Sequence, residues 1–389
     1  MKREIKNIFI TLAAALVLAC ASGAVSARPL TMSIDEFLEL AEVSKAQTQI
    51  GSGEKGAPPP PQNSPPQPSP SPAAIPKWKF KTGGSVYSSP AVSNGVVYFG
   101  SYDNHLYAVE AAIGKEKWKF KTEGRVLSPP TVAGGSVYFG SQDNRFYALD
   151  AATGQERWRH KTQYAIISAP TILDGVVYFS GTDGTLYALD STTGAVKWEF
   201  RPDTGIPSSP VIGDDNTLYF GNARGLYAID IQTGQQKWRY KTDRTIVAAP
   251  AYMDGVVYFG SLDENLYAVD AKTGAQRWKY KTEGGLPFAP AVSSGIVYFG
   301  SADGHLYAVE AETGRERWKW RSPGGVTSAP MIADGKILFG SSTGIYAIDS
   351  ARGQQQWEFK TGRIVTSSPV ASDRRVYFGS WDGNLYALQ

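Results

Sequence analysis

Six aspartates recur at the same place in a repeated turn, and their spacing is the first hint of chemistry in this chain. Each precedes a glycine or a polar residue: Asp103, Asp143, Asp183, Asp263, Asp303 and Asp382. Gathered on one face, six carboxylates would suit a hard cation such as Ca²⁺. An aspartate in a turn also accepts hydrogen bonds from the backbone N–H groups of that turn. We expect the second role, because every copy of the turn needs such a cap.

Residues that commonly bind transition metals or act as nucleophiles are scarce. His105 and His305 occupy the same place in two distant copies of the turn, and His160 lies in a different run, so we do not expect the three to share an ion. One cysteine, Cys20, excludes an internal disulfide framework and a cysteine zinc site. No serine lies in a nucleophile elbow. We therefore expect no metal site and no catalytic constellation.

The charge balance excludes one further class. The 389 residues include 39 Lys and Arg against 36 Asp and Glu, a formal net charge of +3. A nucleic-acid-binding protein would show a basic excess on one face. At 42% hydrophobic and 12% aromatic residues, the chain can bury a large core.

Tryptophans mark a repeat that must position these turns. The first seven are spaced by 40 residues and the eighth by 39: Trp78, Trp118, Trp158, Trp198, Trp238, Trp278, Trp318 and Trp357. Each unit contains four short β-rich runs separated by Gly, Pro and Asp. A period of about 40 residues with four strands is typical of propeller blades. Residues 77–389 are therefore predicted to form an all-β propeller of eight four-stranded antiparallel blades.

The first and last units are incomplete in complementary ways. In the first full unit the runs are 88–92, 96–100, 106–109 and 118–120. The chain ends directly after a third run, and residues 77–81 form a fourth run that precedes any first run. We predict that this N-terminal strand pairs with the last blade and closes the ring. Closure would remove the free sheet edges.

The turn before each tryptophan carries a family resemblance. The pattern Ala-x-Thr-Gly-x-x-x-Trp stands at 151–158, 271–278 and 311–318, with variants at 111–118, 191–198, 231–238 and 351–357. Ile113 and Arg352 replace the threonine in two of the variants. The pattern resembles the tryptophan docking motif of quinoprotein-type (PQQ-like) repeats. Among exported non-enzymatic members, the chain resembles the BamB lipoprotein family of the outer-membrane β-barrel assembly machinery, and it also resembles secreted propellers of the same repeat class.

The same resemblance raises the question of an enzyme. Quinoprotein dehydrogenases of this superfamily use a Ca²⁺-bound quinone, a catalytic aspartate and a pair of adjacent cysteines. This chain has one cysteine and no long insert between its units that could build a cap. The resemblance therefore implies shared ancestry of the repeat without its cofactor. We expect a non-catalytic protein that binds no cofactor.

Loops from the fourth run of one unit to the first run of the next should open near the channel mouth, on the same face as the aspartate turns. They carry Arg125, Arg244 and Arg363, with Tyr164 and Phe288 nearby in register. An anion or a peptide carboxylate could bind there. Acidic residues in the same loops give a mixed charge, and the alternative is that all five are solvated loop residues. We take the five as candidate binding residues, because loops on rigid scaffolds carry function.

Two copies of the aspartate turn depart from the pattern. Residues 222–225 and 341–344 are one residue shorter and contain no aspartate. These turns interrupt the repeated surface in units 4 and 7. They could mark the footprint of a partner.

The first 76 residues precede the repeat. Residues 1–27 are predicted to be an export signal, because Lys2, Arg3 and Lys6 precede an apolar run. Two processing sites remain alternatives: cleavage after Ala27, or a lipobox-like sequence ending in Cys20, which would then carry a lipid. Residues 28–50 are predicted to contain a short amphipathic helix. Residues 51–76 are a proline-rich tether.

Three functions from different classes remain open at this point. The first is a non-catalytic exported scaffold that binds proteins of the cell envelope, in outer-membrane protein assembly if the resemblance extends to function. The second is a carbohydrate or small-ligand binder, and the third is a quinone-dependent oxidoreductase. For the first we expect a monomer in the bacterial periplasm or at the outer membrane. We expect no nucleic-acid partner, and membrane contact only through an N-terminal lipid.

Overall fold

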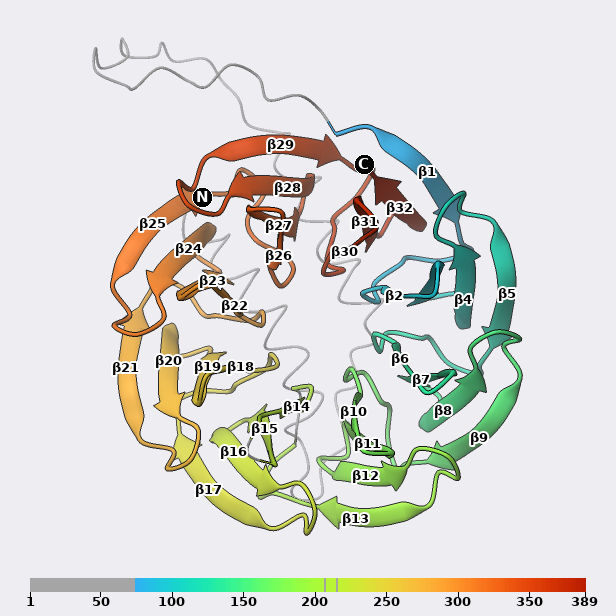
Figure 1. Cartoon of the computed structure of the whole chain (residues 1–389), viewed down its shortest axis with the longest axis horizontal. Helices are drawn as coiled ribbons and strands as arrows, with labels where there is room; N and C mark the ends of the chain where they lie inside the picture. Colours follow the sequence, from blue (N-terminus) through green and yellow to red (C-terminus); the bar gives the residue numbers. More distant parts are fainter. Residues whose placement is uncertain (1–73, 206–207, 215) are drawn as a thin grey trace, which may run out of the picture.

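The computed structural model describes residues 74–389 except 206, 207 and 215, and in this part of the chain the fold is a closed ring of β-sheets (Figure 1). These residues form eight four-stranded antiparallel sheets and no helix, as predicted. The predicted export signal (1–27), the predicted helix (28–50) and all but the end of the tether (51–76) lie outside the described residues. Where the chain is described, it contains no helix long and apolar enough to cross a membrane.

Each sheet is one blade, and its strands succeed one another from the centre of the ring outward (Figure 1). Blade 1 comprises β2 to β5, blades are numbered along the chain, and blade 8 comprises β30, β31, β32 and β1. The inner strands are β2 (Ala91–Ser93), β6 (Thr131–Ala133), β10 (Thr171–Leu173), β14 (Val211–Ile212), β18 (Ala251–Met253), β22 (Ala291–Ser293), β26 (Met331–Ala333) and β30 (Val370–Ser372). The second strands are β3 (Val96–Gly100), β7 (Ser136–Gly140), β11 (Val176–Ser180), β15 (Thr217–Asn222), β19 (Val256–Gly260), β23 (Ile296–Gly300), β27 (Lys336–Ser341) and β31 (Arg375–Gly379).

The outer half of each blade has longer strands. The third strands are β4 (His105–Glu110), β8 (Arg145–Asp150), β12 (Leu186–Asp190), β16 (Gly225–Asp230), β20 (Asn265–Asp270), β24 (His305–Glu310), β28 (Gly344–Asp349) and β32 (Asn384–Leu388). The outer strands are β5 (Glu116–Lys121), β9 (Glu156–Lys161), β13 (Val196–Phe200), β17 (Gln236–Lys241), β21 (Gln276–Lys281), β25 (Glu316–Arg321), β29 (Gln355–Lys360) and β1 (Pro76–Lys81).

The inner strand begins later than its predicted run. Residues 88–92 were predicted to form the first run of blade 1, but the strand is Ala91–Ser93, so the prediction was wrong at its start. Pro90 has no N–H for the ladder. The Ser88 hydroxyl donates to the carbonyl of Ser128 in the next blade at 3.1 Å. This segment therefore joins neighbouring blades before the strand starts.

The hydrophobic core is divided among the seams between neighbouring blades. Val97 and Phe99 of blade 1 cluster with Tyr377 and Leu385 of blade 8. All five residues of β3 are buried, because a neighbouring blade covers each of its faces. Phe99 also stacks on Tyr107 of its own blade, with ring centroids 5.4 Å apart. Since each core lies between two blades, one blade cannot bury its own apolar faces.

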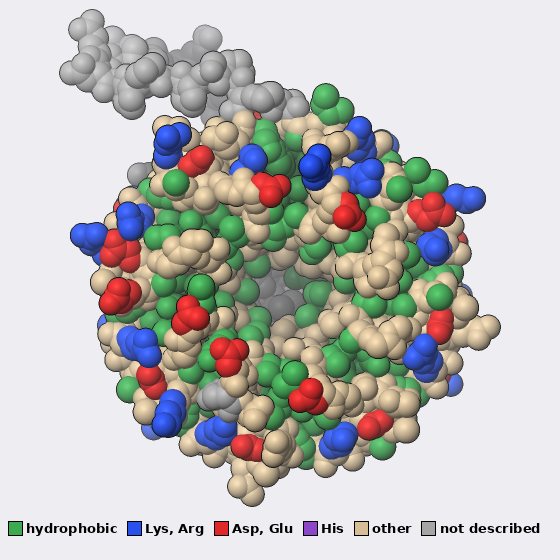
Figure 2. All heavy atoms as spheres, in the orientation of Figure 1, with side chains coloured by type: hydrophobic (Ala, Val, Ile, Leu, Met, Phe, Trp, Pro, Cys, Tyr) green, Lys and Arg blue, Asp and Glu red, His purple; other side chains and the backbone are tan. Residues whose placement is uncertain are grey.

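A view down the ring axis shows how charge is distributed on one face (Figure 2). Hydrophobic side chains surround a central hollow. Acidic and basic side chains are interspersed over the outer part of this face, in keeping with the nearly balanced composition.

The ring closes through strands from opposite ends of the described chain. β1 pairs antiparallel with β32, and Trp78, Lys79 and Phe80 face Ala387, Tyr386 and Leu385. The sheet order β1-β32-β31-β30 makes β1 the outer strand of the last blade, as Figure 1 shows. The predicted closure by the N-terminal strand is confirmed.

The outer-strand tryptophans link each blade to the next. Their indole N–H groups donate to backbone carbonyls of the following blade at 2.9–3.1 Å. The pairs are Trp78 and Ala111, Trp118 and Ala151, Trp158 and Ser191, Trp198 and Ile231, Trp238 and Ala271, Trp278 and Ala311, and Trp318 and Ser350. Trp357 packs against a cluster that contains Tyr386 and Leu388. Each contact places the indole against the turn that delivers the next tryptophan.

The turn between the third and outer strands explains the Thr-Gly pair of the motif. In blade 5, Asp270 Oδ1 accepts hydrogen bonds from the N–H and the hydroxyl of Thr273. Asp270 Oδ2 also accepts a hydrogen bond from Arg277 at 2.8 Å. Arg277 first, and then Thr273, lower the pKa of Asp270 to about 2. In blade 2, Arg157 first, and then Thr153, likewise lower the pKa of Asp150 to about 2.

These turns predict a loss of stability in acid. A carboxyl whose pKa is about 2 in the fold and ~3.9 in the unfolded chain stabilises the fold above pH ~4, and this contribution disappears as the pH falls through about 2. The melting temperature should therefore fall between pH 4 and pH 2. Asp270→Asn should show a shallower fall, because the amide does not titrate. The effect should be small and sensitive to salt, since the turn is exposed. Parallel melting curves for the variant and the wild type across this window would contradict the assignment.

Candidate functional site

The candidate binding face is built from two kinds of connection. Loops from an outer strand to the next inner strand lie against the hairpins that join second and third strands. In blade 1, Tyr102 N–H donates to Ser85 O at 3.0 Å, and Gly83 N–H donates to Asp103 Oδ2 at 2.7 Å. The two sets of connections therefore share one face of the ring, as expected. We call it the hairpin face.

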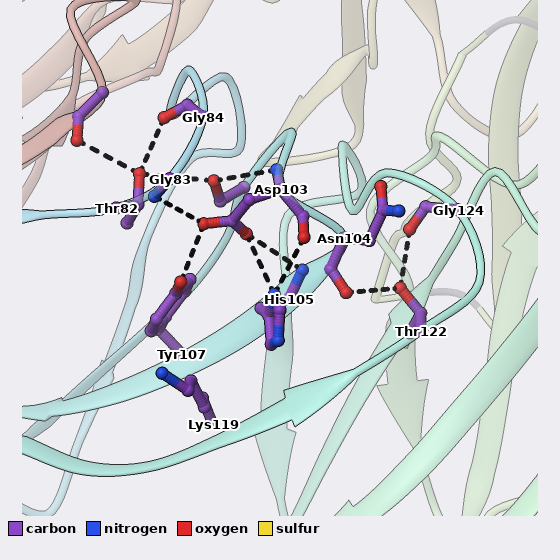
Figure 3. Close-up of polar contacts among 12 residues, drawn as sticks. Thr82, Gly83, Gly84, Asp103, Asn104, His105, Tyr107, Lys119, Thr122 and Gly124 are labelled. Atoms are coloured by element: carbon purple, nitrogen blue, oxygen red, sulfur yellow. Dashed lines mark hydrogen bonds and ion pairs between the residues drawn. The ribbon is translucent and has the colours of Figure 1, made fainter.

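Asp103 shows what the repeated aspartates do (Figure 3). Its Oδ1 accepts from His105 N–H at 3.2 Å, which caps the hairpin as expected. Its Oδ2 accepts from the Tyr107 hydroxyl at 2.7 Å and from the N–H of Gly83 in the incoming loop. Burial and then this contact with Asp103 raise the pKa of Tyr107, so the phenol stays protonated as a donor. One carboxylate thus ties together a hairpin, a third strand and a loop.

The same aspartate–tyrosine pair recurs around the ring. The tyrosine hydroxyl lies 2.7–3.0 Å from the carboxylate in each case. The further pairs are Asp143 and Tyr147, Asp183 and Tyr187, Asp263 and Tyr267, Asp303 and Tyr307, and Asp382 and Tyr386. The tyrosine is the partner that the sequence analysis missed. Its constant spacing, four residues after each aspartate, was the available signal.

The two shortened hairpins replace the missing carboxylate in different ways. In blade 4 the Tyr227 hydroxyl donates to Asp203 Oδ1 of the incoming loop at 2.9 Å. In blade 7 the hydroxyls of Tyr346 and Thr343 lie 3.0 Å apart. Both hairpins end in a glycine with strongly positive φ, Gly225 at 142° and Gly344 at 146°. Units 4 and 7 lack the hairpin aspartate, but their tyrosine hydroxyls still have a hydrogen-bond partner.

Removing one tyrosine hydroxyl tests this account. In Tyr307→Phe, the buried carboxylate of Asp303 loses a charge-assisted hydrogen bond, and we expect a loss of ~1.5–3 kcal/mol in the free energy of unfolding. Tyr346→Phe is the matched control, because its partner Thr343 is neutral, and it should cost only ~0.5–1.5 kcal/mol. Urea unfolding of both variants measures the difference. Equal losses would mean that the carboxylate adds nothing.

The histidines and aspartates do not converge on an ion in the described part of the chain. His105 Nδ1 lies 2.8 Å from the backbone oxygen of Asp103, and His305 Nδ1 lies 3.1 Å from Asp303 Oδ1. His160 meets Tyr187 edge-on, and burial lowers its pKa. Outside residues 1–73 and the three internal gaps, there is no group of three or more His, Cys, Asp or Glu side chains arranged to hold a metal.

The five predicted binding residues lie on five different loops. Arg125, Tyr164, Arg244, Phe288 and Arg363 precede β6, β10, β18, β22 and β30 respectively. Tyr164 is 58% exposed, Arg244 and Arg363 are exposed, and Arg125 and Phe288 are half-buried. All five belong to loops of the hairpin face. They are spread around the ring rather than gathered in one place.

Arg125 instead contacts aromatic residues that the sequence analysis did not select. Its guanidinium lies 4.8 Å from the centre of the Tyr102 ring. Tyr102 is 6.2 Å from Tyr87 and 6.5 Å from Trp381, and Tyr87 is 6.2 Å from Trp381 between ring centroids. We call Tyr87, Tyr102, Trp381 and Arg125 the seam cluster, because they lie beside blade 1 where it adjoins blade 8 on one side and blade 2 on the other. All four side chains are half-buried.

A signal for the seam cluster was present in the repeat. At the hairpin place of Tyr102 and Trp381 the described chain otherwise carries Gln142, Thr182, Leu262 and Ala302 in the full-length hairpins. At the loop place of Tyr87 it carries Leu127, Ile167, Val247, Pro287, Thr327 and Thr366. The three aromatics therefore break the repeat. Finding them required both this comparison and the knowledge that the first and last blades are neighbours.

Comparison with known proteins decides the family. The family model described as "Outer membrane protein assembly factor BamB" matches residues 124–213, 201–293 and 263–389, which is more than half of the chain. The chain belongs to the BamB family. No curated protein matches it.

Solved structures similar to this BamB-family chain share its fold. The structure of BamB from Moraxella catarrhalis has 20% sequence identity and a TM-score of 0.72, over 82% of this chain and 100% of that one. The computationally designed Ika8 protein has 21% identity and a TM-score of 0.71, over 79% and 98%. A europium-containing methanol dehydrogenase has 15% identity and a TM-score of 0.68, over 81% and 93%. Similarity at these identities establishes the propeller fold alone.

Among the residues that the structure describes, the hairpin aspartates are not arranged as the cation site that a Ca²⁺-bound quinone would need. Such a site needs carboxylates that converge on a cation. Here Asp103 and Asp303 each accept hydrogen bonds from a tyrosine and a backbone N–H in their own part of the ring. The repeated carboxylates are used to hold the hairpin face in shape.

Proposed function

We propose that this BamB-family chain is a non-catalytic exported scaffold that binds protein partners through its hairpin face in outer-membrane protein assembly. The observation that carries the proposal is the use of the repeated carboxylates inside the fold. Asp103 and its equivalents bind tyrosines, hairpins and loops rather than pointing together at a substrate. Membership of the BamB family supports the same role.

The hairpin face has the rigidity that a binding scaffold needs. Five of the hairpin aspartates accept an N–H of the incoming loop: Asp103, Asp143, Asp183, Asp303 and Asp382. The hydroxyls of Thr82, Thr122, Thr162 and Thr282 donate to a carbonyl of their own loop and to one of the preceding blade's hairpin. A loop held in one shape loses little entropy when a partner binds. The exposed side chains at the tips of these loops are then free to differ between blades. Such a face binds proteins by shape and local side-chain chemistry.

The family also supports a location in the bacterial envelope. We propose that residues 1–27 direct export and that residues 51–76 hold the ring away from its anchor. Processing at Cys20 would attach the protein to a membrane by a lipid, and cleavage after Ala27 would release it. Metabolic labelling with a palmitate analogue, compared between the wild type and Cys20→Ala, separates the two.

Photocrosslinking in living cells tests the scaffold function. A photoreactive residue at Tyr164, on the hairpin face, should yield adducts with components of outer-membrane β-barrel assembly. The same residue at Lys272, exposed in a turn on the opposite face, should yield none and is the matched control. Deleting the gene should lower the amount of folded β-barrel protein in the outer membrane. Adducts to glycans alone, with unchanged β-barrel protein, would overturn the proposal.

An oxidoreductase function has a separate test. The purified protein is mixed with pyrroloquinoline quinone and Ca²⁺, and the absorbance of the retained quinone is measured after gel filtration. We expect no stoichiometric retention, because the repeated carboxylates already have partners in the fold. Retention of one quinone per chain together with dye reduction by an alcohol would replace the scaffold proposal with an enzymatic one.

A further inference from the structure

The outer strands of the ring are far more basic than the rest of the chain. Together they contain 20 of the 39 Lys and Arg residues but only 5 of the 36 Asp and Glu residues. The remainder of the chain is therefore acidic, and the near balance of the composition hides a separation of charge. Because these strands form the outer rim of the ring, the rim carries an excess of positive charge (Figure 1).

The last and first blades carry six of these basic residues side by side. Their outer strands, β1 and β5, are neighbours on the rim, because Trp78 of β1 donates to Ala111 O of blade 1. All six side chains are exposed, and we call them the lysine rim: Lys77, Lys79, Lys81, Lys117, Lys119 and Lys121. The acidic residue within these two strands is Glu116, which lies 3.8 Å from Lys119 and keeps its own charge.

Blade 8 is less neutralised by its own acidic residues than the other basic blades. In blade 5, Arg277 of the outer strand pairs at 2.8 Å with Asp270, which ends the third strand. Gln389 stands at the place of Asp270 in blade 8. Residues 370–389 and 76–81 contain five Lys and Arg against two Asp and the terminal carboxylate. Positive charge therefore remains in excess at β1 when every carboxylate of the blade is counted.

Protection of exposed strand edges does not explain so many lysines. Charged residues, lysine above all, keep an edge strand from pairing with another chain. β13 and β29 are outer strands too, yet each carries one basic residue against one glutamate. Glu199 and Glu358 stand there at the place of Lys79 and Lys119. An outer strand of this ring is therefore tolerated without a positive excess, and the excess at β1 and β5 needs another reason.

We propose that the lysine rim binds the anionic headgroups of a membrane surface. The rim is convex, and its six basic residues are all lysines, whose flexible point charges suit a diffuse charged surface. The described chain begins two residues before β1, so the predicted tether (51–76) joins the ring at the lysine rim. An anchor at Cys20 would keep this part of the ring within reach of the membrane. The assignment rests on the proposed export and adds a contact of the ring itself to the expected N-terminal lipid.

Co-sedimentation with vesicles tests the proposal on the exported Cys20→Ala chain, which has no cysteine to acylate. Vesicles that mix phosphatidylglycerol with phosphatidylcholine should bind it at low salt and release it at high salt. Vesicles of phosphatidylcholine alone should not bind it. Lys79→Glu combined with Lys119→Glu should lower the partition coefficient at least ~tenfold, because each basic side chain near an anionic membrane contributes about fivefold.

The matched control reverses two lysines on another part of the rim. Lys279 and Lys319 occupy the same strand place in blades 5 and 6. The Lys319 ammonium lies 5.9 Å from the centre of the Tyr307 ring, and Lys119 has the same contact with a tyrosine in blade 1. Lys279→Glu combined with Lys319→Glu changes the net charge by the same amount and should keep most of the binding. Melting curves verify that both double variants are folded.

A fluorophore on one introduced cysteine locates the contact without reversing any charge. Cys20 is the single cysteine of the chain, so the label is specific in the Cys20→Ala background. An environment-sensitive label at Lys121→Cys should shift its emission to shorter wavelength when vesicles bind. The same label at Arg321→Cys, at the equivalent place in blade 6, should not.

Three results would overturn the assignment: no binding to vesicles that contain phosphatidylglycerol, equal losses in the two double variants, or equal spectral shifts at the two labels. Binding of duplex DNA with the same lysine dependence, and not of vesicles, would replace the membrane with a nucleic acid. If vesicles do not bind but Tyr164 still crosslinks to assembly components in cells, the lysine rim assignment fails and the scaffold function survives.

Discussion

A chain that begins at residue 82 should fail to form a stable monomeric ring. It lacks β1 (Pro76–Lys81), so β32 stays paired with β31 but loses its outer antiparallel partner and becomes an open edge. Trp78 and Phe80 also leave the seam between blades 8 and 1, where they pack against Val97, Phe99 and Tyr107. Truncating one buried aromatic side chain to alanine lowers the free energy of unfolding by ~3–5 kcal/mol, and two aromatic side chains are lost here. Together these losses approach the ~5–15 kcal/mol stability of a typical domain.

Size-exclusion chromatography with light scattering, together with thermal melting, measures this effect. We expect oligomers or aggregates from the open edge of β32, because an unpaired strand invites pairing with another chain. A chain that begins at residue 74 keeps β1 and is the matched control. A circular permutant that carries residues 76–81 after Gln389, joined by a copy of the turn at residues 310–315, should recover the monomer. A soluble, cooperative monomer from the chain that begins at residue 82 would show that closure by β1 is dispensable.

Trp278→Ala should lower the free energy of unfolding by ~3–5 kcal/mol. The indole is only 8% exposed, and its N–H donates to Ala311 O in blade 6 at 2.9 Å. Its ring lies 5.9 Å from that of Tyr258 and belongs to the cluster between blades 5 and 6. Alanine at this place would leave a cavity and would remove one of the two hydrogen bonds to Ala311 O, which the Tyr258 hydroxyl also donates to at 3.1 Å. The ring should respond as a unit, because each blade is stabilised by its neighbours.

Two variants define the cause of that loss. Lys279→Ala lies on the same outer strand with an exposed side chain, and it should change stability by less than ~0.5 kcal/mol. Gly314 lies in the turn of blade 6 that the Trp278 indole contacts. Gly314→Ala should also destabilise the fold, because φ of Gly314 is +71° and an added Cβ would lie 2.7 Å from Cε3 of Trp278. Chemical denaturation followed by circular dichroism measures all three. If Trp278→Ala were no worse than Lys279→Ala, the docking role of this tryptophan would be ruled out.

Much of the fold could be predicted because its signals are local and repeated. The spacing of Trp78 and its equivalents marks the blades, and the Gly, Pro and Asp turns separate the strands. The predicted start of the inner strand was wrong, because the Ser88 hydroxyl donates to the next blade. This contact between two units cannot be seen within one unit of the sequence. The role of Asp103 was half predicted. Its hairpin cap follows from turn chemistry, whereas its bond to Tyr107 depends on how the third strand lies beside the hairpin.

The candidate site was less accessible to sequence reasoning. Arg125, Arg244 and Arg363 were selected because they occur in equivalent loops, but equivalent loops of a ring point to different places around it. Trp381 lies in the last hairpin of the chain, yet it meets Tyr87 and Tyr102 from the opposite end of the described chain. Likewise, Asp203 replaces the hairpin carboxylate of blade 4 from a neighbouring loop. Both cases are contacts between segments that the linear order keeps apart.

The sequence by itself determined the number of blades, the order of strands within each, and the closure of the ring by residues 77–81. These follow from a period and from complementary incomplete units, which are properties of the linear chain. Only the tertiary structure decided which aspartates hold tyrosines, which loops compensate for short hairpins, and that Tyr87, Tyr102, Trp381 and Arg125 form one cluster. Ring closure makes the first and last blades neighbours, and the direction of a loop side chain depends on backbone geometry that residue spacing does not encode.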